Sequence, residues 1–437
     1  EIAQCLVGSE MCIRDSMSTV DDKASRILRL IFRTAMNRQK PYGSLTSEEH
    51  YQAAREIGNE GIVLLKNTPV QKKGTPLLPL DDSKYQRILV VGDNAVRLLN
   101  EGGGSSELKV KDMISPLDGM RALYGDKVVY TKGYAAGRPM YGRAEEIPQS
   151  VMDSLRTAAT ELAKEADLVI LFGGLNKNHF QDCEAGDRVT YSLPFGQNEL
   201  IESLLGVNKN MVLVLLSGNA VEMPWLNKVP AVLQGWYLGS MGGNSLADVL
   251  SGAVNPSGKL PFSFPVKLTD CGAHAFDELS YPGDSIKQVY KEDILVGYRW
   301  HDTKKIPALF PFGYGLSYTT FTYGKPVASA KTITADNSLT VTIPVKNTGS
   351  VAGKEVVQLY VGDEKCSVLR PVKELKAFQK ITLAPGEEKE VTFTITPDDL
   401  KFYDETVGGW TAEPGKFKAY IGASSADIRG TVGFELK

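Results

Sequence analysis

Short apolar runs alternate with segments of helical periodicity over residues 46–251. The runs are rich in Val, Ile and Leu and carry no polar residues at alternate positions, which is typical of strands covered by helices on both faces. We expect strands at residues 62–65, 87–91, 128–131, 168–172, 211–215 and 231–234. The spacing of apolar residues predicts helices at 46–61, 115–124, 149–165, 196–206 and 241–251. This alternation predicts an α/β domain with a doubly covered, mostly parallel sheet.

A further helix is predicted upstream, at residues 19–37. Its apolar residues recur at helical spacing, and they are Val20, Ile27, Leu28, Ile31 and Phe32. Ser18 or Thr19 is the expected N-cap, and residues 41–43 are expected to stop the helix.

After about residue 325 the pattern changes to period-2 alternation. The segments with this pattern are 332–346, 354–362, 373–383, 388–396, 415–422 and 431–436. Turn sequences containing Gly and Pro or Asn separate them. Residues 326–437 are therefore predicted to form an all-β antiparallel sandwich. The stretch 309–318 between the two domains is too apolar to be a flexible linker.

Composition and charge exclude several classes of protein. The 437 residues include 49 Lys+Arg and 52 Asp+Glu, so a formal net charge of −3 gives no general attraction to nucleic acid or to an anionic membrane. The apolar runs are far shorter than the ~20 residues that a membrane helix needs. Five Cys without a CxxC pair and four isolated His predict neither a disulfide framework nor a metal site. No cofactor is expected.

The loop after the strand at 168–172 carries the candidate chemistry. Ligand sites in open α/β sheets lie beyond the carboxyl ends of the strands, so acidic residues here are well placed. The loop contains Asp182, Glu184 and Asp187 beside Arg188. Glu184 is a candidate general acid, whose pKa would have to be raised by partial burial or by a neighbouring anion. Asp187 and Arg188 are better interpreted as anchors that fix the loop, and a solvated acidic loop is the alternative.

Two other features of the sequence suggest chemistry less strongly. The consecutive glycines of Gly102–Ser106 lack the spacing of a phosphate loop, so they favour a close approach of the backbone to a ligand or to another domain. Cys183 has no evident His partner, which disfavours a thiol nucleophile.

Several motifs, taken in order, resemble glycoside hydrolase family 3, the β-glucosidase-like enzymes. They are residues 57–67 (IGNEGIVLLKN), 102–106 (GGGSS), 183–188 (CEAGDR) with 193–194 (LP), 247–252 (ADVLSG), 255–261 (NPSGKLP) and 310–318 (FPFGYGLSY). The resemblance covers roughly residues 18–437. It implies the tail of a (β/α)8 barrel and a linker at 17–44, an α/β-sandwich domain at 45–325 and a fibronectin-type-III-like sandwich at 326–437.

The resemblance also implies a retaining exo-β-glycosidase that hydrolyses terminal non-reducing β-linked sugars. Its general acid/base is the Glu of an E-x-x-D-R segment, which here is Glu184, with Asp187 and Arg188 matching. The family's nucleophile is an Asp on a preceding barrel, which needs about 250 residues. We therefore expect a C-terminal piece of a larger enzyme, truncated or split. It would be inactive alone, with the barrel domain as its partner and an oligosaccharide or β-glucoside as substrate.

Alternative functions remain open at this point. One is a non-catalytic carbohydrate-binding or scaffold protein, for which an exposed aromatic platform would be expected. Another is a β-xylosidase-like specificity. The family layout implies a periplasmic or secreted enzyme. Residues 1–16 stay unassigned, with a foreign origin as one interpretation, because they do not lead naturally into the helix that follows.

Overall fold

The computed structural model describes residues 16–39, 43–71, 74–138, 145–178, 180–184, 186 and 188–437. The chain divides after His50 into two compact units, residues 1–50 and residues 51–437. Of the unassigned segment 1–16, all but Ser16 lies outside the described residues.

The first unit contains helix α2 (Met17–Arg33), which is amphipathic as its spacing predicts. It ends at Arg33 rather than at residue 37. The predicted cap at Ser18 or Thr19 is wrong, because Ser16 holds the N-cap position and makes no side-chain capping bond. Helix α2 has no buried residue. Two of the three residues expected to stop it, 41 and 42, are not among those described.

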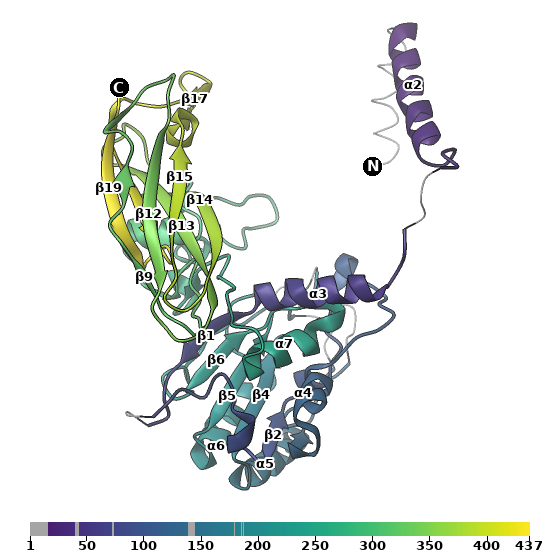
Figure 1. The fold of residues 1–437 in the computed structure, drawn as a ribbon. Coiled ribbons are helices and arrows are strands. Elements are labelled where there is room, and N and C mark those ends of the chain that lie inside the picture. The colour runs from purple at the N-terminus through teal and green to yellow at the C-terminus, as the bar shows by residue number, and fades with distance from the viewer. Residues whose placement is uncertain are drawn as a thin grey trace. The chain divides into compact units, whose positions relative to one another are not determined.

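A six-stranded sheet with the order β1-β6-β5-β4-β2-β3 organises the α/β domain (Figure 1). Its strands are β1 (Val63–Asn67), β2 (Ile88–Val91), β3 (Val128–Thr131), β4 (Leu168–Gly174), β5 (Met211–Leu216) and β6 (Ala231–Gln234). Strand β1 pairs antiparallel with β6, and the other four pairings are parallel. The prediction of a mostly parallel sheet is confirmed.

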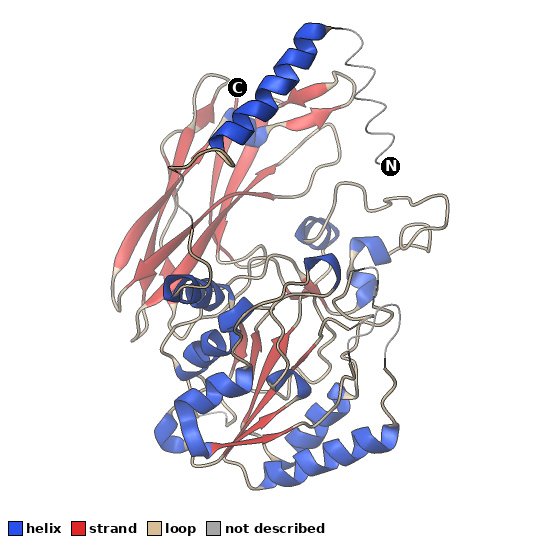
Figure 2. Ribbon diagram, turned by 90° about the vertical axis from the view of Figure 1, so that its right-hand side faces the viewer, coloured by secondary structure: helices blue, strands red, loops and turns tan. Residues whose placement is uncertain are grey.

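Helices cover both faces of this sheet (Figure 2). They are α4 (Pro116–Tyr124), α5 (Gln149–Lys164), α6 (Gln197–Val207) and α7 (Gly242–Ser251). Helix α3 (Glu48–Gly61) packs on α7, where Arg55 pairs with Asp248. Strand β4 shows why its sequence has no polar alternation. Val169 and Leu171 pack in the cluster with α5 and α6, whereas Ile170 and Phe172 pack with α4 and α7.

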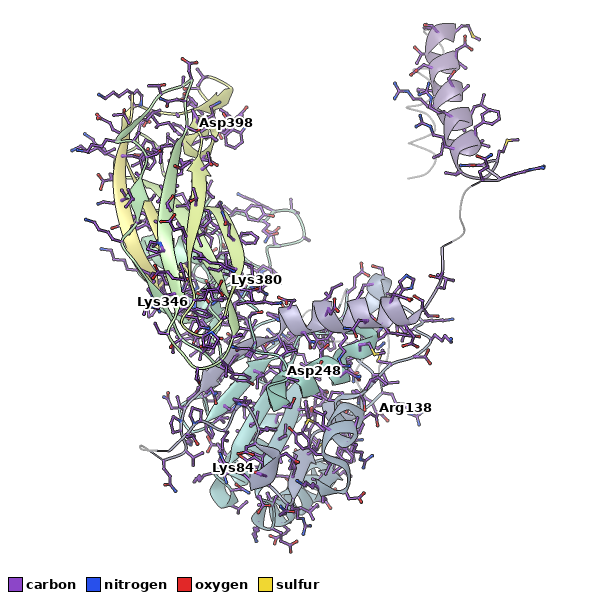
Figure 3. All side chains as sticks on the ribbon, in the orientation of Figure 1. Lys84, Arg138, Asp248, Lys346, Lys380 and Asp398 are labelled. Atoms are coloured by element: carbon purple, nitrogen blue, oxygen red, sulfur yellow. The ribbon has the colours of Figure 1, made fainter. Side chains whose placement is uncertain are left out.

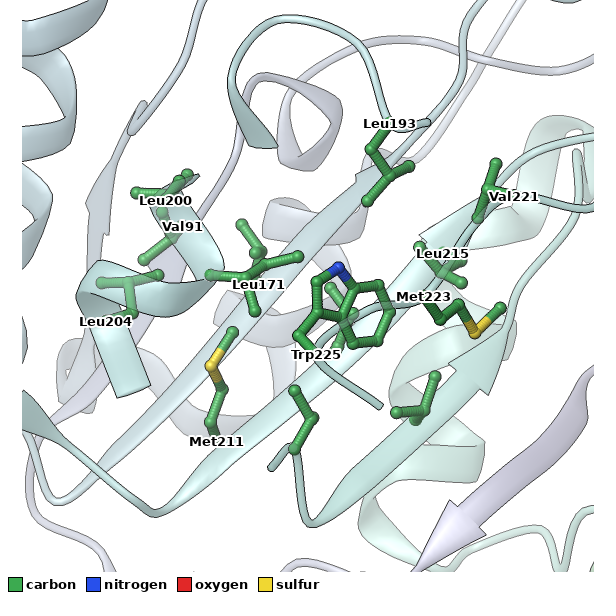
Figure 4. Packing of buried hydrophobic residues seen from close by; sticks show 14 of the residues in the cluster. Val91, Leu171, Leu193, Leu200, Leu204, Met211, Leu215, Val221, Met223 and Trp225 are labelled. Atoms are coloured by element: carbon green, nitrogen blue, oxygen red, sulfur yellow. The ribbon is translucent and has the colours of Figure 1, made fainter. Parts of the chain in front are cut away.

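The core on the α5–α6 side is built around Trp225, whose side chain is fully buried. Figure 4 shows its indole ring among Leu171, Leu215 and Met223. The indole N–H donates to Asn198 Oδ1 at 2.8 Å, so the buried polar atom is satisfied.

Residues 262–325 contain elements that the sequence pattern did not predict. Strands β7 (Phe264–Pro265) and β8 (Ala308–Phe310) pair antiparallel, and helix α8 (Tyr298–Lys304) precedes β8. The stretch 309–318 packs against the α/β domain, as its apolar character predicts. Tyr314 Oη donates to the Leu65 carbonyl at 3.0 Å, and Tyr318 Oη donates to the Val249 carbonyl at 2.8 Å.

Short 3-10 helices occupy several connections. They are η1 (Asp82–Lys84), η2 (Asp93–Ala95), η3 (Gly104–Ser106), η4 (Gly125–Lys127), η5 (Gly239–Met241), η6 (Leu268–Asp270), η7 (Gly272–His274) and η8 (Pro397–Leu400).

The C-terminal part is a β-sandwich of two main sheets. One has the order β10-β12-β15 with β9 also on β12, the other has the order β11-β19-β18-β13-β14, and β16–β17 form a separate hairpin. The strands are β9 (Phe321–Tyr323), β10 (Val327–Ala328), β11 (Thr332–Ile333), β12 (Leu339–Asn347), β13 (Gly353–Asp363), β14 (Glu374–Leu383), β15 (Glu388–Ile395), β16 (Phe402–Asp404), β17 (Gly409–Thr411), β18 (Gly415–Gly422) and β19 (Ile428–Leu436). The pairing is antiparallel as predicted, except that β11 and β19 are parallel.

Ion pairs join the sandwich to the α/β domain within the second unit. Glu60 on α3 accepts hydrogen bonds from Lys354 on β13 and from Lys380 on β14, and Lys380 is labelled in Figure 3. Lys259 Nζ lies 3.3 Å from Glu355 Oε2, and both side chains are largely buried. The two domains therefore share one interface of paired charges.

Candidate active site

The candidate site lies where β4 and β5 end, at the carboxyl edge of the parallel sheet. The loop after β4 carries residues 175–191, the turn after β5 carries Gly218 and Asn219, and Tyr237 follows β6. This is the edge at which ligand sites form in open α/β sheets.

A cavity of about 540 Å³ opens at this edge. Its volume falls in the range of about 300–1,000 Å³ that is typical of small-molecule sites. Its lining residues are Gly102, Gln181, Asp182, Cys183, Glu184, Arg188, Val189, Thr190, Tyr191, Gly218, Asn219, Tyr237, Leu268, His274 and Tyr281.

Glu184 lines this cavity and is exposed to solvent. Its Oε2 accepts a hydrogen bond from the backbone N–H of Ser105 at 2.6 Å. Hydrogen bonds from the Ser105 hydroxyl and from its N–H hold the pKa of Glu184 below the ordinary value of a glutamate. The shift is opposite to the raised pKa that a general acid requires.

The glycine loop at 102–106 forms the wall behind Glu184. Gly103 N–H donates to the Asp182 carbonyl at 2.8 Å, and Glu184 N–H donates to the Gly103 carbonyl at 3.4 Å. Gly104 has φ +90°, and a Cβ there would lie only 2.3 Å from Glu184 Cβ. The glycines thus permit a close backbone approach, and the partner is the neighbouring loop of the same domain. The approach to a ligand or to another domain that the sequence predicts stays a prediction.

Asp182, two residues before Glu184, bonds the loop to residues that follow strands β5 and β6. Its Oδ2 accepts from Gly218 N–H at 2.6 Å and from Tyr237 Oη at 2.7 Å. Its Oδ1 accepts from Asn219 Nδ2 at 2.7 Å. Both carboxylate oxygens are therefore engaged within the protein, which makes Asp182 an anchor rather than a free acid.

Arg188 lies half-buried in the same wall. Its Nη2 donates to the Ala220 carbonyl at 2.8 Å, and its guanidinium carbon lies 6.0 Å from the centre of the Tyr191 ring. Burial lowers the pKa of Arg188. The role of Arg188 as a loop anchor stays a prediction. Asp187, the other predicted anchor, lies outside the described residues.

A distant segment completes the cavity wall. Leu268, His274 and Tyr281 line it from the chain that follows β7. The rings of His274 and Tyr281 meet edge to face, with centroids 4.6 Å apart and an interplanar angle of 62°. Burial lowers the pKa of His274, so its imidazole is neutral at neutral pH.

Sequence reasoning missed most of the residues that surround Glu184. Asn219 and Tyr237 directly follow strand ends, so the rule that sites form at carboxyl edges could have pointed to them. His274 and Tyr281 lie in a segment without periodicity, and no signal in the sequence identifies them. Among described residues, no group of three or more His, Cys, Asp or Glu side chains could hold a metal ion. No helix in the described ranges is long and apolar enough to cross a membrane.

Comparison with protein families gives two matches. The model described as the glycosyl hydrolase family 3 C-terminal domain matches residues 62–318, which is more than half of the chain. The model described as a fibronectin type III-like domain matches residues 355–425.

The relatives with curated names are longer proteins. The β-glucosidase BoGH3A of Bacteroides ovatus is 68% identical over 419 residues, which cover 96% of this chain and 56% of that protein. The thermostable β-glucosidase B of Acetivibrio thermocellus is 39% identical, with coverage of 94% and 52%. The chain thus spans about half the length of the curated relatives that it matches.

Solved structures that resemble this chain are likewise those of longer β-glucosidases. The β-glucosidase DesR of Streptomyces venezuelae, solved with D-glucose, superposes with a TM-score of 0.86 at 27% identity, covering 99% of this chain and 66% of its own. A Bifidobacterium adolescentis GH3 β-glucosidase gives a TM-score of 0.84 at 32% identity, with coverage of 99% and 60%.

Proposed function

This chain belongs to glycosyl hydrolase family 3, and on that premise we propose that it is the C-terminal part of a retaining exo-β-glycosidase of the β-glucosidase type, in which Glu184 is the general acid/base. The substrate would be a β-glucoside or an oligosaccharide with a terminal β-linked sugar. A β-xylosidase-like specificity differs only in the sugar that is held.

One observation carries this assignment. Of the two carboxylates that line the cavity in the described part of the chain, Asp182 has both oxygens engaged, whereas Glu184 is exposed. A proton donor must reach a substrate atom, and Glu184 meets that condition. The E-x-x-D-R segment around it supports the same choice.

In the proposed reaction, a carboxylate of a preceding barrel domain attacks the anomeric carbon. The bond from that carbon to the glycosidic oxygen breaks, and the oxygen takes the proton of Glu184 as it leaves. Glu184, now a carboxylate, then removes a proton from water as the water displaces the enzyme carboxylate. The two carboxyl groups would lie about 5–5.5 Å apart, which is the separation that retention requires.

The test uses the chain together with its barrel domain and two aryl β-glucosides, one with a good and one with a poor leaving group. Glu184→Ala should lose about 100-fold or more in kcat/KM on the poor leaving group, because general acid catalysis is worth about 10²–10⁴-fold. It should lose much less on the good one, and azide should restore turnover. Glu405→Ala, at an exposed position of the sandwich, is the control.

The chain alone should hydrolyse neither substrate, because a nucleophile is needed as well. Measurable turnover by the purified chain, abolished in Glu184→Gln, would contradict this proposal. Equal losses on both substrates in Glu184→Ala would contradict the acid role.

A non-catalytic carbohydrate-binding role is the second candidate, and one observation favours it. Trp410 is 69% exposed and Tyr403 is 54% exposed, and their rings lie 5.9 Å apart across the β16–β17 hairpin. Trp225 and Trp300 are buried and cannot contribute. Retardation of the chain in a β-glucan gel, lost in Trp410→Ala, together with no hydrolysis by the barrel-joined protein, would favour this candidate.

A periplasmic or secreted location is proposed as well. A relative from Salmonella typhimurium, 34% identical over 441 residues, is named a periplasmic β-glucosidase. Fractionation of cells that make the complete protein tests this location.

A further inference from the structure

The segment at 268–281 brings an aromatic pair to the cavity that Glu184 lines. It joins the sheet edge only in the folded chain, because His274 lies 90 residues after Glu184. Neither the family motifs nor the strand-end loops include it.

This segment is held in place by contacts outside the cavity. Trp300 on α8 donates its indole N–H to the Asp270 carbonyl at 3.1 Å. The Phe276 ring meets the Trp300 ring edge to face at 5.7 Å. A Cβ on Gly272 would lie 3.3 Å from the Trp300 ring, so the backbone packs directly on it. The wall that carries His274 and Tyr281 is therefore formed before any ligand arrives.

The cavity combines aromatic faces with a few polar groups. Tyr237 and Tyr191 use their hydroxyl groups within the protein, on Asp182 and on the Pro265 carbonyl, so they offer the cavity their rings. Asn219, Gln181 and the exposed Glu184 provide polar atoms nearby. Such a mixture suits a ring with apolar faces and polar edges, such as a sugar.

The carboxylates decide which part of the substrate this cavity can hold. A retaining site needs a second carboxylate about 5–5.5 Å from the acid, on the far side of the sugar ring that is attacked. Asp182 is the other carboxylate among the described lining residues, and both of its oxygens are engaged. The second carboxylate must therefore come from outside these lining residues, and the attacked ring lies between it and Glu184. The group that departs with the protonated oxygen is bonded to the atom that Glu184 reaches.

We propose that this cavity is the subsite for the leaving group, and that His274 and Tyr281 determine which leaving groups are accepted. The ligand class is a second β-linked sugar or an aryl group, held against the edge-to-face pair. This inference rests on the proposed function, since it takes Glu184 as the proton donor.

The experiment compares two substrates of the barrel-joined enzyme. One is a β-linked glucose disaccharide, whose leaving group is a sugar, and the other is β-glucosyl fluoride, whose leaving group is one atom. Tyr281→Ala and His274→Ala should each lower kcat/KM for the disaccharide by about 10- to 100-fold, the range expected for lost pocket contacts. The value for the fluoride should change less than about threefold. Tyr290→Ala is the matched control, since Tyr290 is 69% exposed in the same region and does not line the cavity.

Equal losses on both substrates, or no loss on the disaccharide, would overturn the inference. Two variants are used so that one of them still decides the matter if the other fails to fold, as judged by circular dichroism. Glu184→Gln separates the two proposals. If it leaves disaccharide hydrolysis unchanged, the proposed function fails. If it abolishes hydrolysis while both wall variants behave like the control, only the leaving-group subsite is wrong.

Discussion

Replacing Gly104 by Ala would displace the Glu184 side chain while leaving its carboxyl group in the protein. The new Cβ would lie 2.3 Å from Glu184 Cβ and 2.9 Å from its Oε2. Two carbon atoms rest at about 3.5–4.0 Å, so the glutamate would have to retreat by roughly 1.2–1.7 Å. A misplacement of about 1 Å can cost about 100-fold in rate. We therefore expect a loss of about 100-fold in kcat/KM on an aryl β-glucoside with a poor leaving group.

Backbone strain alone would not produce this loss, and a second glycine separates the two effects. Gly104 has φ +90° and Gly125 has φ +54°, so Ala is strained at both positions, by about 1–3 kcal/mol. No atom lies within 4 Å of a Cβ placed on Gly125. Gly125→Ala should therefore lower the unfolding midpoint by about 2–4 °C for each kcal/mol of strain and leave the rate of hydrolysis unchanged.

The assay is hydrolysis of the two aryl glucosides by the barrel-joined protein, with thermal unfolding followed in parallel. Gly104→Ala should show its loss mainly on the poor leaving group, since that substrate depends on the acid. Full activity in Gly104→Ala would refute the reasoning, and so would an equal rate loss in Gly125→Ala. Either result would mean that the glycine loop does not fix the position of Glu184.

Two further predictions concern anchoring. Asp182→Ala removes the acceptor of three hydrogen bonds, each worth about 1.5–3 kcal/mol when the acceptor is charged. The value of kcat/KM should therefore fall at least tenfold for the aryl glucoside with the poor leaving group, and by less for the one with the good leaving group. Equal losses on the two substrates would argue against an anchoring role. Burial raises the pKa of Glu60, but the hydrogen bonds from Lys354 and Lys380 outweigh it and hold that pKa below its ordinary value. The stabilisation is therefore complete above the unfolded-state pKa of about 4.3 and is lost as the pH falls through the folded-state pKa. The unfolding midpoints of wild type and Glu60→Gln should differ at pH 7 and converge below pH ~4, and a difference that stays constant with pH would contradict this assignment.

The sheet could be predicted because its strands are continuous apolar runs. Strand β4 was expected at 168–172 and extends to Gly174. The two added residues are glycines, which weaken a strand on their own and so end a pattern-based prediction early. Gly174 has φ +116°, and a Cβ there would lie 2.3 Å from the Leu216 carbonyl oxygen. Pairing of Gly173 with Leu215 and of Gly174 with Leu216 on β5 therefore continues the strand beyond the apolar run.

The elements between residues 262 and 325 could not be predicted for a related reason. Strands β7 and β8 have two and three residues, too few to show a period. They exist because Phe264 and Phe310 are packed together in the core, with ring centroids 6.2 Å apart. Their formation depends on contacts between residues 46 positions apart, which periodicity does not record.

For the candidate site as well, the sequence indicates some residues and not others. Glu184 is marked by a local motif, so its position could be read from the sequence. Asp182 stands in the same loop, and its sequence neighbourhood does not distinguish an acid from an anchor. The distinction comes from Gly218 and Asn219, which follow another strand and bond to its two oxygens. Chemistry that depends on one residue is local, whereas positioning depends on which loops meet at the sheet edge.

Glu184 in this chain carries a pKa shift opposite to the one that proton donation requires. Hydrogen bonds from Ser105 stabilise the carboxylate, and burial is too slight to offset them. A general acid near neutral pH needs a raised pKa, which burial or a nearby anion can provide. In the proposed enzyme a docked barrel would exclude water, and its carboxylate about 5–5.5 Å away would supply the anion. The partner that brings the nucleophile would thus also convert Glu184 from a stabilised carboxylate into an acid. The chain alone is therefore expected to be inactive for two separate reasons, and adding a nucleophile without the burial and charge of the barrel would remedy only one of them.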